Sequence, residues 1–313
     1  MITRWWNHPG DMTGSSAAAS PAPSASAGAA GLVVRRAQFA RLEGAARVVA
    51  LEAPPGSGKT VLLRSWIREA GLSGSTAWLS VRDEERDTQR FWISVLDTLR
   101  GTAAGSALVR GLTAAPVLNG GVIVERLLED LASLEDRVWL VLDDLHELRS
   151  SDALQQLELL VMRAPAELRF VLSSRHDVRL GLHRLRLHGE LTEIRAVDLR
   201  FTVEEARALF DAVGVALSES ALARLVDRTE GWAAGLRLAA LSMARHPNPD
   251  QLAAEFSGSE RTVAEYLLAE MLERQPEDVQ QVLLRTSLLD RVKPRRPKIS
   301  LHHRTRKSSA RAN

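Results

Sequence analysis

One short glycine-rich segment limits the possible folds of this chain more than any other. It reads Ala53-Pro-Pro-Gly-Ser-Gly-Lys-Thr60; a strand-like run, Arg47-Val-Val-Ala-Leu51, precedes it, and a helical pattern, Val61 to Ala70, follows it. Gly56 and Gly58 allow a tight turn whose successive N–H groups point inward, and the next helix adds partial positive charge at its N-terminus. This order of strand, loop and helix predicts a phosphate-binding loop in an α/β fold.

The loop also carries side chains suited to a nucleotide. Lys59 supplies a mobile ammonium group for the β- and γ-phosphates, and Thr60 supplies a hydroxyl for Mg²⁺. The first position is Ala where the strict pattern has Gly, so a small residue is kept there. We therefore predict a nucleotide site whose loop contacts come from Pro55, Gly56, Ser57, Gly58, Lys59, Thr60 and Val61.

Short β-rich runs alternate with helical stretches from Val33 to about Arg195. The expected strands are Arg47–Leu51, Thr76–Val81, Val138–Leu142, Phe170–Ser173 and Leu191–Ile194. Apolar residues between them recur at helical spacing, at Phe91, Val95 and Leu99 and at Leu127, Leu128, Leu131 and Leu134. Nearly continuous apolar strands are typical of a parallel sheet that helices cover on both faces.

Polar residues follow two of these strands. Asp143 and Asp144 end the run from Val138, and Arg175 ends Phe170-Val-Leu-Ser-Ser-Arg175. Ligands bind at the carboxyl ends of parallel strands. We predict that Asp143 holds Mg²⁺, that Asp144 orients or deprotonates the attacking water, and that Arg175 senses the γ-phosphate. The alternative for Arg175 is an ordinary surface arginine.

After Leu199 the strand pattern stops and a helical region begins. Thr202-Val-Glu-Glu205 is a capping box that opens a helix carrying Ala206, Leu209 and Phe210. Further helices are expected over Glu219–Thr229, Trp232–Ala244, Arg261–Arg274 and Glu277–Leu289. We expect a leader over 1–31, a nucleotide-binding domain over 32–198, a helical domain over 199–258, a further helical segment over 259–291, and a basic tail over 292–313.

Composition excludes several other classes of protein. Cysteine is absent, which rules out disulfides and thiolate metal sites. No apolar run approaches the roughly 18 residues that cross a bilayer. The small residues of Thr13–Gly31 form a flexible leader without the hydrophobic core of a signal peptide, so a cytoplasmic location is expected. Trp5 and Trp6 precede this leader, and the pattern assigns them no role.

The net charge of +2 conceals an asymmetry. Nine Lys or Arg residues and no acid lie in 291–313, whereas the first 290 residues hold 32 basic against 39 acidic residues, a net charge of −7. The basic tail is interpreted as a solvated end, with a nucleic-acid or localisation arm as the alternative. No zinc site, Gly-x-Ser-x-Gly elbow, dinucleotide fingerprint or helix-turn-helix signature is apparent.

At this point a set of ordered motifs resembles a known family. Besides the phosphate loop, the set comprises Val34-Arg-Arg36, Ala77-Trp-Leu-Ser80, Leu142-Asp-Asp-Leu-His146, Ser173-Ser-Arg175, Leu199-Arg-Phe-Thr-Val-Glu-Glu-Ala206, Gly231-Trp-Ala-Ala-Gly-Leu236 and Leu284-Arg-Thr-Ser-Leu-Leu289. From about Leu32 to Arg291 the chain resembles the MalT-like, LuxR-type regulators, which belong to the signal-transducing (STAND) class of P-loop ATPases.

The resemblance implies a slow ATPase that works as a switch. ATP and an inducer would favour an open, self-associating form, ADP a closed resting form, and hydrolysis would reset the switch. Lys59, Thr60, Asp143 and Asp144 match the phosphate and magnesium motifs, and Arg175 matches the sensor arginine. Arg35, Gly231 and Trp232 match segments that contact the nucleotide, although Ala233 stands where Pro is frequent in the family.

Family members continue much further, through a winged-helix region and a helical-repeat inducer sensor to a DNA-binding helix-turn-helix. The resemblance implies that 259–291 is the start of an incomplete winged-helix region. The likeness here stops near Arg291, which predicts a truncated or frame-shifted member that keeps the ATP switch without its output, with no specific DNA binding. Two alternatives stay open. One is a stand-alone AAA-like ATPase that remodels a partner protein. The other is a DNA-binding protein that acts through its basic tail. A small-molecule kinase is disfavoured because no lid or acceptor-binding motif is apparent.

Overall fold

The structure, a computed structural model, describes residues 33–82, 85, 87–109, 120–177, 180–244, 246–256 and 279–281. The chain divides into two compact units, Met1–Glu260 and Arg261–Asn313, and every element discussed below belongs to the first. The predicted leader, the predicted helix over 261–274, most of that over 277–289 and the basic tail lie outside the described residues. In the described part of the chain, no helix combines the length and apolar character needed to cross a membrane.

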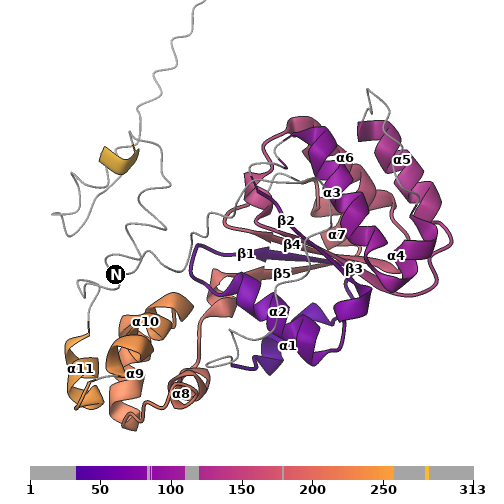
Figure 1. The fold of residues 1–313 in the computed structure, drawn as a ribbon. Helices are drawn as coiled ribbons and strands as arrows, with labels where there is room; N and C mark the ends of the chain where they lie inside the picture. Colours follow the sequence, from indigo (N-terminus) through magenta and orange to yellow (C-terminus); the bar gives the residue numbers. More distant parts are fainter. Residues whose placement is uncertain are drawn as a thin grey trace, which may run out of the picture. The chain divides into compact units, whose positions relative to one another are not determined.

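A five-stranded parallel sheet forms the centre of this unit (Figure 1). Its strands are β1 (Val48–Glu52), β2 (Thr76–Ser80), β3 (Val138–Asp143), β4 (Leu168–Ser174) and β5 (Leu191–Arg195). Their order across the sheet is β2-β3-β4-β1-β5, and every neighbouring pair is parallel. The five predicted strands and the predicted parallel α/β architecture are therefore confirmed. All five carboxyl ends lie at one edge of the sheet, where the phosphate loop follows β1.

Helices cover both faces of this sheet (Figure 1). They are α1 (Arg36–Leu42), α2 (Lys59–Glu69), α3 (Thr88–Arg100), α4 (Ala103–Leu108), α5 (Gly120–Leu131), α6 (Ser151–Arg163) and α7 (His183–Leu187). Short 3₁₀ turns are η1 (Ser73–Ser75), η3 (Leu145–Glu147) and η4 (Ala196–Leu199). The sequence did not lead us to predict α1, α4, α6 or α7, whereas α2 was expected.

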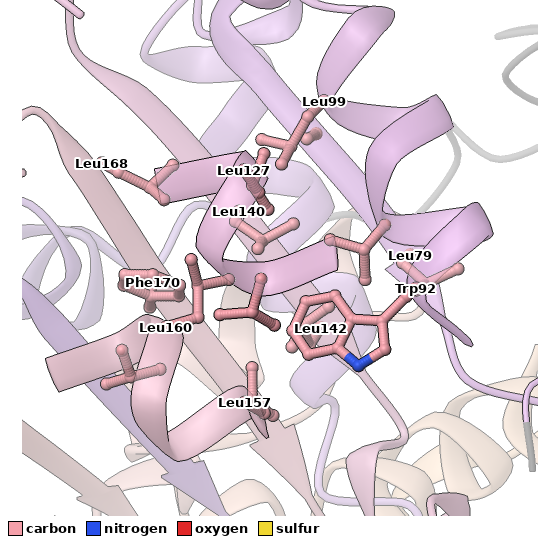
Figure 2. Packing of buried hydrophobic residues seen from close by; sticks show 14 of the residues in the cluster. Leu79, Trp92, Leu99, Leu127, Leu140, Leu142, Leu157, Leu160, Leu168 and Phe170 are labelled. Atoms are coloured by element: carbon pink, nitrogen blue, oxygen red, sulfur yellow. The ribbon is translucent and has the colours of Figure 1, made fainter. Parts of the chain in front are cut away.

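Alternate residues of the strands enter two separate hydrophobic cores, as the two-residue period of a strand requires. Val49, Val141 and Val171 pack with α1 and α2 on one face. Leu140 and Phe170 pack with α3, α5 and α6 on the other face, where Figure 2 shows Trp92, Leu127 and Leu157 around them. All six residues of β3 are buried. Burial on both faces explains why the strands read as continuous apolar runs.

The predicted helical stripes lie in the second core. Phe91, Val95 and Leu99 of α3 are fully buried, and Asp87 caps this helix by accepting hydrogen bonds from the backbone of Gln89 and Arg90. In and after α5, the residues Leu127, Leu131 and Leu134 are buried, and Leu128 packs against the same cluster. These apolar and aromatic residues are core, as expected.

Between the sheet and residue 256, the described residues form α8 (Val203–Asp211), α9 (Glu219–Arg228), α10 (Ala233–Met243) and α11 (Pro249–Glu255). The predicted capping box is confirmed, since Thr202 and Glu205 each accept a hydrogen bond from the other's backbone N–H. The helix α11 was not expected, because the prolines around it indicated a boundary. Pro249 instead occupies the first turn, where its missing N–H costs nothing, after an Asn248 cap.

Candidate functional site

The glycine-rich segment after β1 has the backbone of a phosphate loop. Gly56 and Gly58 lie in the left-handed region, with φ of 73° and 82°, and Gly58 caps α2. The hydroxyl and N–H of Ser57 both turn back to the carbonyl of Pro54, at 2.8 and 3.4 Å. Such a turn at a helix N-terminus makes a concave site for an anion.

Lys59 lies under this loop, with 7% of the residue exposed. Its Nζ donates to the carbonyl oxygens of Ala53 at 2.6 Å and Pro54 at 3.3 Å. Burial lowers the pKa of Lys59, an effect that the nearby carboxylates of Asp144 and Asp143 oppose. The ammonium group is therefore held at the loop by oxygen acceptors, and phosphate oxygens are acceptors of the same kind.

Thr60 and Asp143 form the second part of the site. The Thr60 hydroxyl donates to Oδ2 of Asp143 at 2.7 Å, which links the start of α2 to the end of β3. Asp143 is 1% exposed, and its Oδ1 accepts the N–H of Asp144 at 3.1 Å. A hydroxyl and a carboxylate are hard oxygen ligands of the kind that Mg²⁺ prefers. The two predicted metal ligands thus lie together and fit that ion.

Asp144 follows in a sharp turn. Its φ of 54° is unusual for a residue with a side chain, and the turn starts η3. Burial is the main cause that raises the pKa of Asp144, followed by the charge of Asp143; the charges of Arg175 and Lys59 lower it. A carboxyl whose pKa lies above its ordinary value holds a proton more readily, which suits a group that acts on water.

Arg175, after β4, completes the group of charges. Its guanidinium acts electrostatically on Lys59, on Asp144 and on His146, so the charged groups that follow β1, β3 and β4 lie near one another. The Ser174 hydroxyl donates a hydrogen bond of 2.6 Å to the carbonyl oxygen of His176, the residue after Arg175, and so fixes the backbone there.

His146 belongs to this site, although the sequence analysis gave it no role. Its side chain is 7% exposed, and neither ring nitrogen has a hydrogen-bond partner. Nδ1 lies 4.0 Å from Oδ1 of Asp144, and the ring meets that of His176 edge-on at 5.6 Å. Burial is the main cause that lowers the pKa of His146 to about 4, so the ring is neutral at pH 7. The sequence feature that could have identified His146 is its position two residues after the Asp143-Asp144 pair.

The predicted contact segment from the helical region also reaches the loop. Gly231 has a φ of 68°, in the left-handed region, and the chain turns at this glycine just before Trp232. The Trp232 Nε1 donates to the carbonyl of Pro55 at 3.3 Å, and the N–H of Ala234 donates to the carbonyl of Gly56 at 2.9 Å. Both contacts are to the loop itself.

Two residues predicted to contact the nucleotide, Arg35 and Val61, do not join this group of side chains at the loop. The Arg35 side chain is buried, and its guanidinium binds Glu205 and the carbonyls of Leu199 and Arg200. Val61 is 57% exposed on the first turn of α2. The structure therefore brings the loop, the carboxylates and Arg175 together, and it holds the Arg35 guanidinium on the helical region.

Comparison with known proteins relates the sequence of this chain to two groups of relatives. The serine/threonine-protein kinase PknK of Mycobacterium tuberculosis is 30% identical over 255 residues, which are 80% of this chain and 23% of that protein. The HTH-type transcriptional regulator MalT of Klebsiella pneumoniae is 29% identical over 267 residues, 82% of this chain and 29% of the regulator. The chain therefore spans about a quarter of the length of these relatives. No family model matches it.

Among solved structures, a Walker-type ATPase of Pyrococcus abyssi has a TM-score of 0.53 at 16% identity and covers 81% of this chain and 77% of its own. At that identity the likeness shows the fold. The chain thus has the fold of a P-loop ATPase, and over about four fifths of its length its sequence is similar to that of MalT-like regulators.

Proposed function

We propose that this chain is a nucleotide-dependent switch module of a MalT-like regulator, which binds ATP or ADP with Mg²⁺ and hydrolyses ATP slowly. The observation that carries the proposal is the convergence at one edge of the sheet of the phosphate loop, the Thr60–Asp143 pair and the charges of Lys59, Asp144 and Arg175. The sequence similarity to MalT supports the regulatory part.

Each residue has a role in this proposal. The loop N–H groups and Lys59 hold the phosphates, and Thr60 with Asp143 would hold Mg²⁺, which neutralises phosphate charge when bound. Asp144 orients the attacking water and accepts its proton. We add His146 to this step because its neutral ring lies between the carboxylates of Asp144 and Glu147, with Nε2 3.6 Å from Glu147 Oε1, and neither ring nitrogen makes a hydrogen bond. Arg175 stabilises charge on the γ-phosphate.

The contacts between the helical region and the loop support a switch. Trp232 and Ala234 donate hydrogen bonds to the loop carbonyls of Pro55 and Gly56. A change in the loop conformation when phosphates bind would therefore alter contacts at the start of α10. The proposal keeps the expected boundaries, 32–198 for the nucleotide-binding domain and 199–258 for the helical domain. It also includes self-association in the ATP state, control by an inducer or partner protein, and a cytoplasmic location.

The test is nucleotide binding by the full chain and by Lys59→Ala. We expect fluorescent ATP and ADP analogues to bind the parent chain, and affinity to fall at least about 100-fold in the variant, because buried hydrogen bonds from a charged group are lost at two phosphates. Arg207→Gln, far from the loop in sequence and breaking an exposed ion pair with Glu219, is the control. Equal affinity in Lys59→Ala contradicts the site.

Turnover and assembly test the switch part separately. We expect single-turnover release of phosphate to be slow, and light scattering to show larger assemblies with ATP than with ADP. Fast multiple turnover by an assembly that forms with either nucleotide would instead favour a remodelling ATPase.

A further inference from the structure

Arg35 contacts more polar groups of the helical region than its predicted role as a nucleotide ligand requires. Its Nη1 donates to the carbonyl of Leu199 at 2.9 Å, and its Nη2 donates to that of Arg200 at 2.9 Å. Nε and Nη2 also donate to the two carboxylate oxygens of Glu205, at 3.1 and 3.0 Å, and the guanidinium stacks on the Phe201 ring at 4.5 Å. The guanidinium thus holds residues 199–205 against the start of α1, which Arg35 precedes.

That segment in turn fixes the residue before Trp232. The N–H of Phe201 donates to the carbonyl of Gly231 at 2.9 Å. The approach is close: a Cβ on Gly231 would lie 2.7 Å from the carbonyl oxygen and 2.9 Å from the nitrogen of Phe201. Gly231 therefore has little freedom to move while Arg35 holds residues 199–201.

Trp232 and the start of α10 lie directly on the phosphate loop. The indole donates to the carbonyl of Pro55, and the N–H of Ala234 donates to that of Gly56. The indole would lie 2.7 Å from a Cβ on Gly56, and the methyl group of Ala233 would lie 3.5 Å from one on Gly58. The loop is thus packed from Pro55 to Gly58.

These contacts determine the direction of the loop peptides. In a trans peptide the C=O and N–H groups point in opposite directions. With its carbonyl bound to the indole, the peptide that joins Pro55 to Gly56 turns its N–H away from α10, and the peptide that joins Gly56 to Ser57 is fixed in the same way. A phosphate loop binds its anion through N–H groups, so their direction controls affinity.

We infer that Arg35 is a positioning residue for the phosphate loop, acting through Glu205, residues 199–201 and Trp232 rather than by touching the nucleotide. Glu205 is its essential partner, because that carboxylate meets two nitrogens of the guanidinium while also capping α8 at Thr202. The inference deepens the proposed function and rests on it for the nucleotide, but the order of the loop is a property of the protein alone.

The experiment compares Arg35→Gln, Arg35→Lys and Glu205→Gln in the full chain. Glu205→Gln removes the charge and keeps an oxygen for the cap. Hydrogen exchange of peptides that cover 53–60, measured without nucleotide, reports the order of the loop. Binding of a fluorescent ADP analogue reports affinity. Arg207→Gln again serves as the control, since its ion pair joins two helices of the same region.

We expect Arg35→Gln to speed exchange over 53–60 and to weaken ADP binding about 2- to 30-fold, the range for coupling through intermediate residues. Arg35→Lys should recover part of both effects, because it keeps the charge and loses the fork. Glu205→Gln should change both in the same direction by less, and the control should change neither.

Two results would overturn the inference. Weaker ADP binding with unchanged hydrogen exchange would make Arg35 a direct nucleotide ligand. Unchanged ADP binding together with unchanged exchange would mean that the contacts of Arg35 with residues 199–205 have no effect on the loop. Should Arg35→Gln fail to fold, Arg35→Lys and Glu205→Gln decide by the same two measurements. If the parent chain binds no ADP, the proposed function fails, while exchange over 53–60 still decides the positioning role.

Discussion

The phosphate loop is contacted by two segments that differ in what they offer. The end of β3 brings side chains: Asp143 accepts the Thr60 hydroxyl, and Asp144 acts on the charge of Lys59. The segment 231–234 of the helical region brings an indole, methyl groups and one backbone N–H. The first segment supplies chemistry, and the second supplies the shape of the loop.

This difference predicts how each side responds to substitution. Changes at β3 should alter metal and phosphate binding and leave the stability of the loop nearly intact. Changes on the helical side should alter stability first and binding second, because the contacts there are packing and backbone hydrogen bonds.

The largest effect is expected for Gly56→Ala. The left-handed backbone alone costs an alanine about 1–2 kcal/mol, and its Cβ would lie 2.7–2.9 Å from Trp232 and Ala234, which adds about 1–3 kcal/mol of overpacking. Gly214→Ala is the matched control, since its φ of 75° is close to the 73° of Gly56 and nothing lies within 4 Å of the added Cβ. Urea unfolding of both variants isolates the contact with the helical region.

A second substitution checks the origin of that contact. Trp232→Ala in the Gly56→Ala background should lose less stability than the sum of the two single losses, because two of the three nearest atoms to the new Cβ belong to the indole. Purely additive losses in the double variant would mean that the loop and the helical region do not press on each other.

The next effect is on the β3 side. Asp143→Ala removes the acceptor of the Thr60 hydroxyl and a hard ligand for Mg²⁺, so ATP affinity measured with Mg²⁺ should fall about 10- to 100-fold, the value of one charged hydrogen bond. Titration with and without Mg²⁺ checks this. ADP affinity without the metal should hardly change; an equal fall in both conditions would place Asp143 in a purely structural role.

The two sides also differ in how far the sequence predicted them. The five strands, the loop and the Thr60–Asp143 pair followed from apolar runs, glycine spacing and strand ends, because each depends on local pattern and on the rule that parallel strands end together. The same local rules gave the capping box at Thr202.

The remaining contacts could not be found in this way. No local pattern shows that the Arg35 guanidinium binds carbonyls 164 and 165 residues away, or that Ala234 donates to Gly56, since backbone acceptors have no identity in the sequence. The sequence shows that His146 follows the Asp-Asp pair, but it does not show that the ring is buried, because the burial depends on how η3 packs against β4. Tertiary packing decides such contacts.

His146 provides a pH test of the β3 side. Its pKa of about 4 lies below the ordinary 6.5, so between these values the unfolded chain binds a proton that the folded chain does not, and stability falls as the pH falls from 6.5 to 4. His146→Asn should lose about 1 kcal/mol less over that range, after allowance for solvent screening.

Neighbouring charges require that this be measured as a difference between the two chains. Arg175, His176 and Lys59 disfavour the charged ring and Glu147 favours it, while the raised pKa of Asp144 gives a pH dependence of the opposite sign. These groups are present in both chains, so their contributions largely cancel. Parallel urea curves at pH 7 and pH 5 suffice, and identical losses in the parent and His146→Asn would place the ring in a solvated position.

The smallest effect is expected for Trp232→Phe, which keeps an aromatic ring on Gly56 and removes the hydrogen bond to Pro55. At 3.3 Å that bond contributes about 0.5–1 kcal/mol, so ADP affinity should fall about 2- to 5-fold with little change in the urea midpoint. Because packing is retained, any loss of affinity reports the direction of the peptide between Pro55 and Gly56. Unchanged affinity would assign the shape of the loop to the packing of the ring and to the Ala234 N–H instead.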